Sequence, residues 1–151
     1  MNSAQHATRL SRRFLSLSAA SLLAFSLPSF AAGWAVNLSG AEEVPPVASQ
    51  GKGSGEIAVT ADGMVSGMIT VSGMTPTVAH IHDGAKGQNG PVLIKLERTA
   101  TGFALPAGAK FSPEQMARFK AGNTYVNVHS EAFPPGEIRG QLTPPMGGSG
   151  Y

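Results

Sequence analysis

Three histidines in this chain have the spacing of metal ligands on a β-sheet. His80 and His82 are two residues apart, so a strand over 77–82 places both imidazole rings on one face and the intervening apolar side chain on the other. His129 ends a second alternating stretch, 124–129, whose valines would face the core while His129 faces outward. If these strands lie near each other, three imidazole rings converge on the outer face of a sheet.

Three imidazole nitrogens with one open position suit copper or zinc, whereas calcium and magnesium prefer oxygen ligands. The sequence therefore predicts a single copper or zinc ion bound by His80, His82 and His129. An alternative stays open, in which the domain is a metal-free structural or interaction module and its histidines hydrogen-bond to the loop 83–91. The fourth histidine, His6, lies in a leader segment and is not a candidate ligand.

Polar residues close to these histidines are expected to support the site. Asp83 follows His82 directly and could be a fourth ligand or orient a ring. Glu137 and Arg139 alternate along the chain and so share one face. They would form a surface ion pair there, or Arg139 would attract a small anion to the open metal position. The residues expected around the three ligands are Asp83, Asn127, Glu137 and Arg139.

Residues 1–31 have the pattern of a cleavable signal peptide. Three arginines precede an apolar run over 14–27, which is short for a membrane span, and Ser29 and Ala31 form a small-x-small cleavage site. The arginine pair at 12–13 also resembles a twin-arginine signal, so either export route is open. The sequence predicts a periplasmic or secreted protein.

Removal of this leader changes the charge of the chain. The full sequence has 11 Lys and Arg against 9 Asp and Glu, but three arginines lie in the leader, which leaves a net charge of −1. The remaining chain has no basic face for phosphates and no further apolar stretch of membrane-spanning length, so neither nucleic acid nor membrane is an expected partner. One domain is expected over 32–143, followed by a disordered tail over 144–151.

Several chemistries are excluded by composition and spacing. The chain has no cysteine, which removes thiolate metal sites, thiol nucleophiles and iron–sulfur clusters. Glu42 and Glu43 are adjacent, so in an extended segment their carboxylates point in opposite directions and do not form a glycosidase pair. No residue pattern identifies a protein partner or decides whether the chain is an enzyme.

Short alternating stretches between glycine and proline turns predict an all-β fold. The glycine-rich residues 51–55 are expected to form a flexible turn. One helix is expected at about 113–121, because Ser112 is a good N-cap, Pro113 suits the first position and Gln115 completes a capping box. The whole pattern predicts a Greek-key-like antiparallel β-sandwich or barrel. The expected strands are 34–39, 56–60, 64–71, 77–82, 92–96, 102–105, 124–129 and 137–142.

Five motifs in order along the chain resemble the CHRD domain, which is named for chordin and also occurs in bacterial exported proteins. The resemblance covers about 34–143 and implies an extracytoplasmic, β-rich domain. The growth-factor binding of chordin is not carried over, because this chain has none of chordin's cysteine-rich modules. The motifs are 43–46 (EVPP), 79–82 (AHIH), the glycine series 84–92, 125–129 (YVNVH) and 135–141 (PGEIRGQ).

A second and weaker resemblance is to the sandwich of the copper/zinc superoxide dismutases. There too a His-x-His strand runs into a glycine-rich loop, a later strand supplies another histidine, and an arginine lies near the copper. His80, His82, His129 and Arg139 match those roles. The chain shows no bridging histidine, no zinc-loop ligands and no disulfide pair, so dismutase activity is a third alternative, behind metal binding and the metal-free module.

Overall fold

The computed structural model describes residues 33–144. The predicted signal peptide, 1–31, and residues 145–151 of the predicted tail, 144–151, lie outside the described residues. The helices are η1 (Gly40–Glu42) and α1 (Pro113–Lys120). The strands are β1 (Trp34–Ser39), β2 (Lys52–Val59), β3 (Val65–Ser72), β4 (Pro76–Asp83), β5 (Val92–Lys95), β6 (Glu97–Arg98), β7 (Gly102–Ala104), β8 (Thr124–Ser130) and β9 (Ile138–Leu142).

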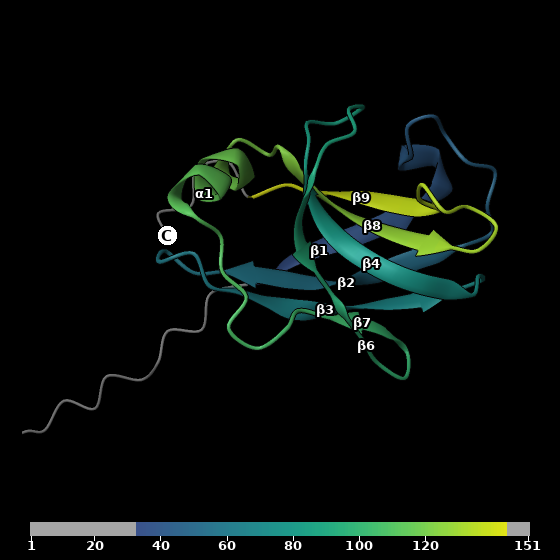
Figure 1. Cartoon of the computed structure of the whole chain (residues 1–151), viewed down its shortest axis with the longest axis horizontal. Coiled ribbons are helices and arrows are strands. Elements are labelled where there is room, and N and C mark those ends of the chain that lie inside the picture. Colours follow the sequence, from purple (N-terminus) through teal and green to yellow (C-terminus); the bar gives the residue numbers. More distant parts are fainter. Residues whose placement is uncertain (1–32, 145–151) are drawn as a thin grey trace, which may run out of the picture.

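All nine strands belong to one sheet in the order β5-β4-β8-β9-β1-β2-β3-β7-β6. Every strand pair is antiparallel. The sheet curls into a nearly closed barrel with α1 at one end (Figure 1). The segment between β5 and β6 helps to close the seam, where the Leu96 N–H donates to the Ala79 carbonyl at 2.9 Å. The predicted all-β antiparallel fold is confirmed.

The core is built from the inward-facing residues of alternating strands. Ile57, Ile81 and Val126 are completely buried, and Met116 and Phe119 of α1 pack against the same cluster. The helix begins with the predicted capping box: the Ser112 N–H donates to Gln115 Oε1 at 2.8 Å, and the Gln115 N–H donates to Ser112 Oγ at 3.2 Å. No helix among residues 33–144 is long and apolar enough to cross a membrane.

The glycine-rich segment 51–55 is not the predicted flexible turn, because β2 already begins at Lys52 and pairs with β1 and β3 over its length. The glycines allow neighbouring strands to approach closely. A Cβ on Gly55 would lie 1.9 Å from the Met68 carbonyl oxygen, where no side chain fits. The short elements β6 and η1 were not predicted. Strand β2 begins four residues before its predicted start, and every other strand end lies within one residue of the prediction.

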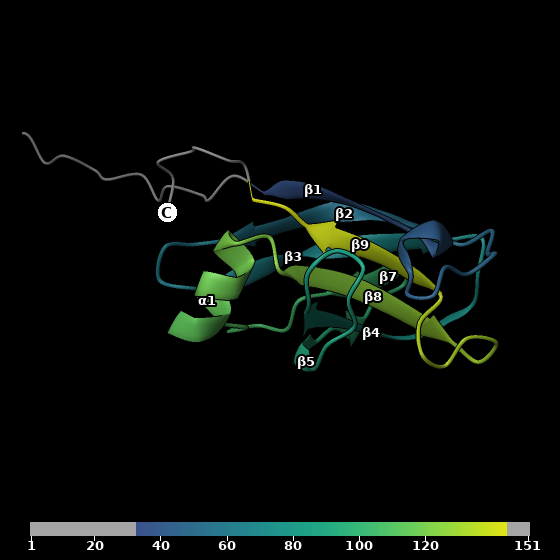
Figure 2. The same ribbon diagram turned by 90° about the horizontal axis from the view of Figure 1, so that it is seen from above.

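The outer face of β8 is covered, although alternation predicts that one face of a strand is open. Every residue of β8 is buried. The cover is the loop from β4 to β5, residues 84–91, which lies across β8 and β9 when the domain is seen from above (Figure 2). We call residues 84–91 the roof loop. The histidines therefore lie on the outer face as predicted, but His82 is covered by the backbone of the roof loop at Gly90, and His80 is half-buried.

Candidate metal centre

The three predicted ligands come together on the outer face of β4 and β8. These strands are antiparallel neighbours, with His80 opposite Asn127 and His82 opposite Tyr125, so His129 lies diagonally from His80. His80 Nδ1 is 3.1 Å from His129 Nε2. One ring nitrogen from each histidine can be chosen so that all three lie within 4.8 Å of one another.

Backbone carbonyls fix the orientation of two of these rings. His82 Nδ1 lies 2.9 Å from the Gly90 carbonyl oxygen, and His129 Nδ1 lies 2.9 Å from the Pro134 carbonyl oxygen. A carbonyl can only accept, so each Nδ1 carries the proton and, in the neutral ring, each Nε2 keeps a lone pair. His80 Nδ1 then donates its proton to His129 Nε2. Carbonyl contacts of this kind orient metal-binding histidines in many proteins.

Burial disfavours the protonated forms of His80 and His82. The His82 side chain is 8% exposed. Burial, followed by the neighbouring His129, His82 and Lys95, lowers the pKa of His80 to about 4. Burial also lowers the pKa of His82, against the opposing effect of its bond to Gly90. His82 Nε2 is buried and has no hydrogen-bond partner among the described residues, which leaves it available to a ligand.

Tyr125 and Gly90 hold the His82 ring from two sides. The Tyr125 ring stacks on the His82 ring with centroids 4.9 Å apart and an interplanar angle of 10°. The Gly90 N–H donates to the Tyr125 hydroxyl at 3.2 Å while the Gly90 carbonyl accepts from His82. A hydrogen bond from a histidine to the loop 83–91 was expected for the metal-free alternative, and the bond of His82 to Gly90 is of this kind. The support from Tyr125 was not predicted, although Tyr125 shares the outer face with His129 by simple alternation.

Arg139 is placed differently from the expectation that it attracts anions to the metal. Its side chain is 1% exposed and lies under the roof loop. The guanidinium donates to the Ala85 and Gln88 carbonyls at 3.1 and 2.8 Å and to Asn89 Oδ1 at 3.2 Å. It also stacks over the Tyr125 ring, 3.4 Å from the centroid. No hydrogen bond joins it to a histidine in residues 33–144, so it anchors the roof loop.

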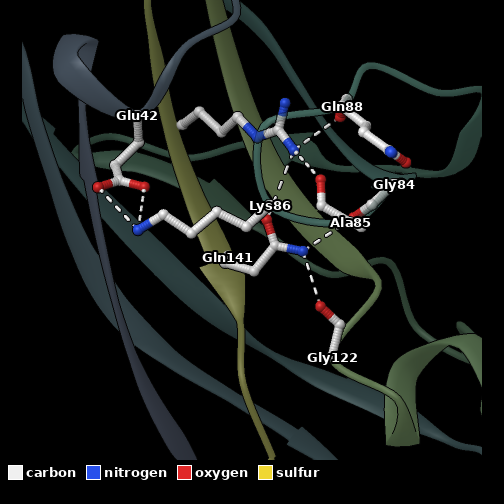
Figure 3. A network of polar contacts seen from close by, with 8 residues as sticks. Glu42, Gly84, Ala85, Lys86, Gln88, Gly122 and Gln141 are labelled. Carbon is white, nitrogen blue, oxygen red and sulfur yellow. Dashed lines mark hydrogen bonds and ion pairs between the residues drawn. The ribbon is translucent and has the colours of Figure 1, made fainter.

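Further polar contacts tie the roof loop to the barrel (Figure 3). Gln141 Nε2 donates to the Gly84 and Gly122 carbonyls, both at 2.8 Å. Lys86 Nζ lies 3.0 Å from Glu42 Oε2, which joins the loop to η1. The ion pair of Lys86 with Glu42 is exposed and contributes little to stability. The two hydrogen bonds of Gln141 contribute more, because each provides a donor to a backbone carbonyl.

Two other predicted supporting residues form contacts with groups other than the histidines. Alternation along β4 places Asp83 opposite to His82, and its carboxylate lies 3.6 Å from Arg118 Nε of α1. Glu137 accepts a hydrogen bond from Ser49 Oγ at 2.6 Å. The predicted ion pair of Glu137 with Arg139 is not among the salt bridges of the described residues, because the roof loop occupies the guanidinium.

Comparison with known proteins identifies the family. The model of the CHRD domain matches residues 34–142, most of the chain. The chain belongs to the CHRD domain family. No curated protein and no solved structure matched it. The resemblance found in the sequence motifs is therefore confirmed for CHRD, and the likeness to superoxide dismutases gains no support from these comparisons.

The CHRD domain also buries an acidic residue that the sequence reasoning set aside. Glu43 is 6% exposed, and its Oε1 has no hydrogen-bond partner among the described residues. Asn127, the fourth predicted supporting residue, is 3% exposed, and its Oδ1 is also unpartnered. A Cβ on Gly136 would lie 2.8 Å from Glu43 Oε1 and 2.6 Å from Asn127 Oδ1, so both oxygens flank the same glycine.

Burial raises the pKa of Glu43 to about 7, against the opposing effects of Arg139 and of the hydrogen bond from the Val44 backbone. The sequence carried one usable signal for this burial. Pro45 and Pro46 follow Glu43 after one residue, and such a stiff segment can be held against the barrel at little entropic cost. Alternation alone separates Glu43 from Glu42 but does not say which of them is buried.

Replacing Gly90 with alanine should displace the roof loop of the CHRD domain. A Cβ at this position would lie 1.7 Å from the Asp83 carbonyl oxygen, so backbone must move. We expect a loss of about 2 kcal/mol in the free energy of unfolding, measured by urea denaturation.

Gly87→Ala is the control for this substitution, because nothing lies within 4 Å of the Cβ position of Gly87 and only its positive φ opposes alanine. That variant should lose about 1 kcal/mol. Equal losses would contradict the proposed close contact.

Proposed function

We propose that this CHRD domain binds a single copper or zinc ion through His80, His82 and His129. The observation that supports this proposal best is the convergence of one ring nitrogen from each histidine within 4.8 Å. In the same cluster, His82 Nε2 is buried and has no hydrogen-bond partner among the described residues. Removing a ring nitrogen from water without giving it a partner is costly, and such a cost is usually offset by a ligand. Metal handling or redox chemistry at an open coordination position is the role that this site would serve.

The donor set favours copper or zinc over other ions. Imidazole nitrogens suit both metals. Calcium or magnesium would require oxygen ligands, and the cluster of three histidines contains no carboxylate. The lowered pKa values of His80 and His82 reduce competition from protons near neutral pH. The leader pattern of residues 1–31 supports export, so we place this activity in the periplasm or outside the cell.

A metal-free structural or interaction module is the second candidate. It is favoured by the 3.1 Å contact of His80 Nδ1 with His129 Nε2, which is an ordinary hydrogen bond that needs no ion. In that case the histidines would serve only to hold the roof loop and the turn after β8 in place. The two candidates differ in one measurable property, which is retention of metal.

Metal content of the leader-free chain, purified without a histidine tag, tests the proposal. After loading with Cu(II) or Zn(II) and desalting, we expect about one equivalent in the wild type and a large loss in each of His80→Ala, His82→Ala and His129→Ala. The matched control is Asp83→Asn, which changes an acid next to His82 whose carboxylate contacts Arg118. This variant should retain its ion.

Each outcome separates the two candidates. Less than about 0.1 equivalent in the wild type would reject the metal site and leave the module, because a site with three imidazole ligands should retain its ion through desalting. Full retention in all three alanine variants would place the ion elsewhere and also reject it. Circular dichroism of each variant confirms that the barrel has folded before metal is measured.

A further inference from the structure

A small cleft lies next to the metal centre, between the segment after η1 and the turn from β8 to β9. Its volume is about 170 Å³, below the roughly 300–1,000 Å³ of sites for drug-sized ligands. Glu43 carries the only carboxyl group among the residues that line it. The remaining walls are mostly apolar and include Pro45, Pro46, Val47, Phe133 and Pro135.

One oxygen of the carboxyl group in this cleft lacks a hydrogen-bond partner among the described residues. Glu43 is 94% buried, since its exposed fraction is 6%, and its Oε1 accepts no hydrogen bond from residues 33–144. Arg139 influences Glu43 electrostatically, but the guanidinium donates its hydrogen bonds to Asn89 and to the roof-loop carbonyls. No salt bridge to Glu43 is formed within the described part of the chain. The cleft therefore combines an unpaired acceptor with apolar walls.

We propose that this cleft binds a primary ammonium group on a short aliphatic stem, with Glu43 as its acceptor. An ammonium group supplies both a positive charge and several N–H donors to the unpaired carboxylate oxygen. The proline and phenylalanine side chains would cover the methylenes of the stem, which removes apolar surface from water. This site is separate from the three histidines and does not depend on a bound metal.

Other ligand classes fit the cleft less well. Calcium needs six to eight oxygen ligands and magnesium six, but the lining offers one carboxylate and few other side-chain oxygens. An anion would be repelled by the ionised Glu43. A neutral alcohol could donate one hydrogen bond but would not neutralise the carboxylate. A primary ammonium group on an aliphatic stem occurs in free alkylamines and in the lysine side chains of proteins.

Titration of the isotope-labelled, leader-free chain with n-butylammonium tests this assignment. The measurement is made above pH 7, where the carboxyl group of Glu43 is mostly ionised. We expect saturable shifts of the backbone amides of Phe133 and Gly136, and no saturation with n-butanol. Glu43→Gln should weaken binding at least about tenfold. The matched control is Glu42→Gln, which removes the same charge from the neighbouring residue, whose partner is Lys86 outside the cleft, and should bind as tightly as the wild type.

The assignment is overturned if n-butanol binds as well as n-butylammonium, or if Glu43→Gln binds as tightly as the wild type. An absence of saturation in the wild type overturns it as well. One further ligand distinguishes the natural sources. Saturation by Nα-acetyl-lysine N-methylamide as well as by n-butylammonium supports a lysine side chain of a partner protein, whereas saturation by n-butylammonium alone supports a free amine.

Discussion

Replacing Arg139 with methionine should lower the free energy of unfolding by about 3 kcal/mol or more. The substitution keeps an apolar stem but removes a guanidinium that is 1% exposed and donates to Ala85, Gln88 and Asn89. The Ala85 carbonyl keeps its hydrogen bond from the Gln88 N–H, but the Gln88 carbonyl and Asn89 Oδ1 lose this donor at a cost of about 1–3 kcal/mol each. The stacking on Tyr125 is lost as well. The roof loop would then lose its main anchor to β9.

Chemical denaturation measures this effect, and Arg118→Met is its matched control. Arg118 is the partner of Asp83 at 3.6 Å, but its side chain is 59% exposed, so its loss should cost less than about 1 kcal/mol. Hydrogen exchange of the Gly90 amide should become faster only in the Arg139 variant. This amide donates to the Tyr125 hydroxyl, and the bond depends on the position of the roof loop that Arg139 anchors. Similar unfolding free energies for the two variants would contradict the anchoring role of Arg139.

The Arg139 variant should also bind metal more weakly. The carbonyl that orients His82 belongs to Gly90, so a loosened roof loop frees the ring to rotate. Loss of contacts that orient a ligand typically costs 10–100-fold in metal affinity. This second effect depends on the proposed metal site, whereas the loss of stability does not.

Glu43→Gln should change the pH dependence of stability. The pKa of Glu43 is about 7 in the folded domain, against an ordinary value of 4.5. Between about pH 4.5 and pH 7, Glu43 holds more protons in the folded state than in the unfolded state. The contribution of Glu43 to stability therefore falls as pH rises. The difference between these pKa values corresponds to roughly 3–3.5 kcal/mol in full, because one pKa unit is about 1.4 kcal/mol. The glutamine variant has no such dependence at this position.

Unfolding free energies of both proteins, measured from about pH 4.5 to above pH 7, test this prediction. We expect the glutamine variant to gain roughly 2–3 kcal/mol relative to the wild type as pH rises across this window. Other groups, including His80 and His82, titrate in both proteins, so their contribution cancels in the difference. A difference that is constant with pH would contradict the raised pKa of Glu43.

The sequence was sufficient to predict the histidine cluster because the cluster depends on local alternation. His80 and His82 share a face wherever the strand lies, and the valines of 124–129 fix the side to which His129 points. Only the pairing of β4 with β8 had to be assumed. The same rule places Asp83 on the face opposite to His82. The expectation that Asp83 supports the metal site did not take this alternation into account.

The roof loop could not be predicted in the same way. Its position depends on contacts between residues about 50 positions apart, such as Arg139 with Ala85 and Gln88, and no local period reports such contacts. The glycines of the loop signalled a turn but not its direction. The same lack of local signal explains why 51–55 was expected to be a turn, since close packing of glycines against neighbouring strands is a tertiary property.

Anomalous diffraction from crystals of the copper- or zinc-loaded domain tests the central claim most directly. The account predicts one strong peak about 2.0–2.1 Å from a ring nitrogen of each of His80, His82 and His129. It is contradicted if the peak lies elsewhere, or if the loaded crystals show no peak and the 3.1 Å contact between His80 and His129 persists.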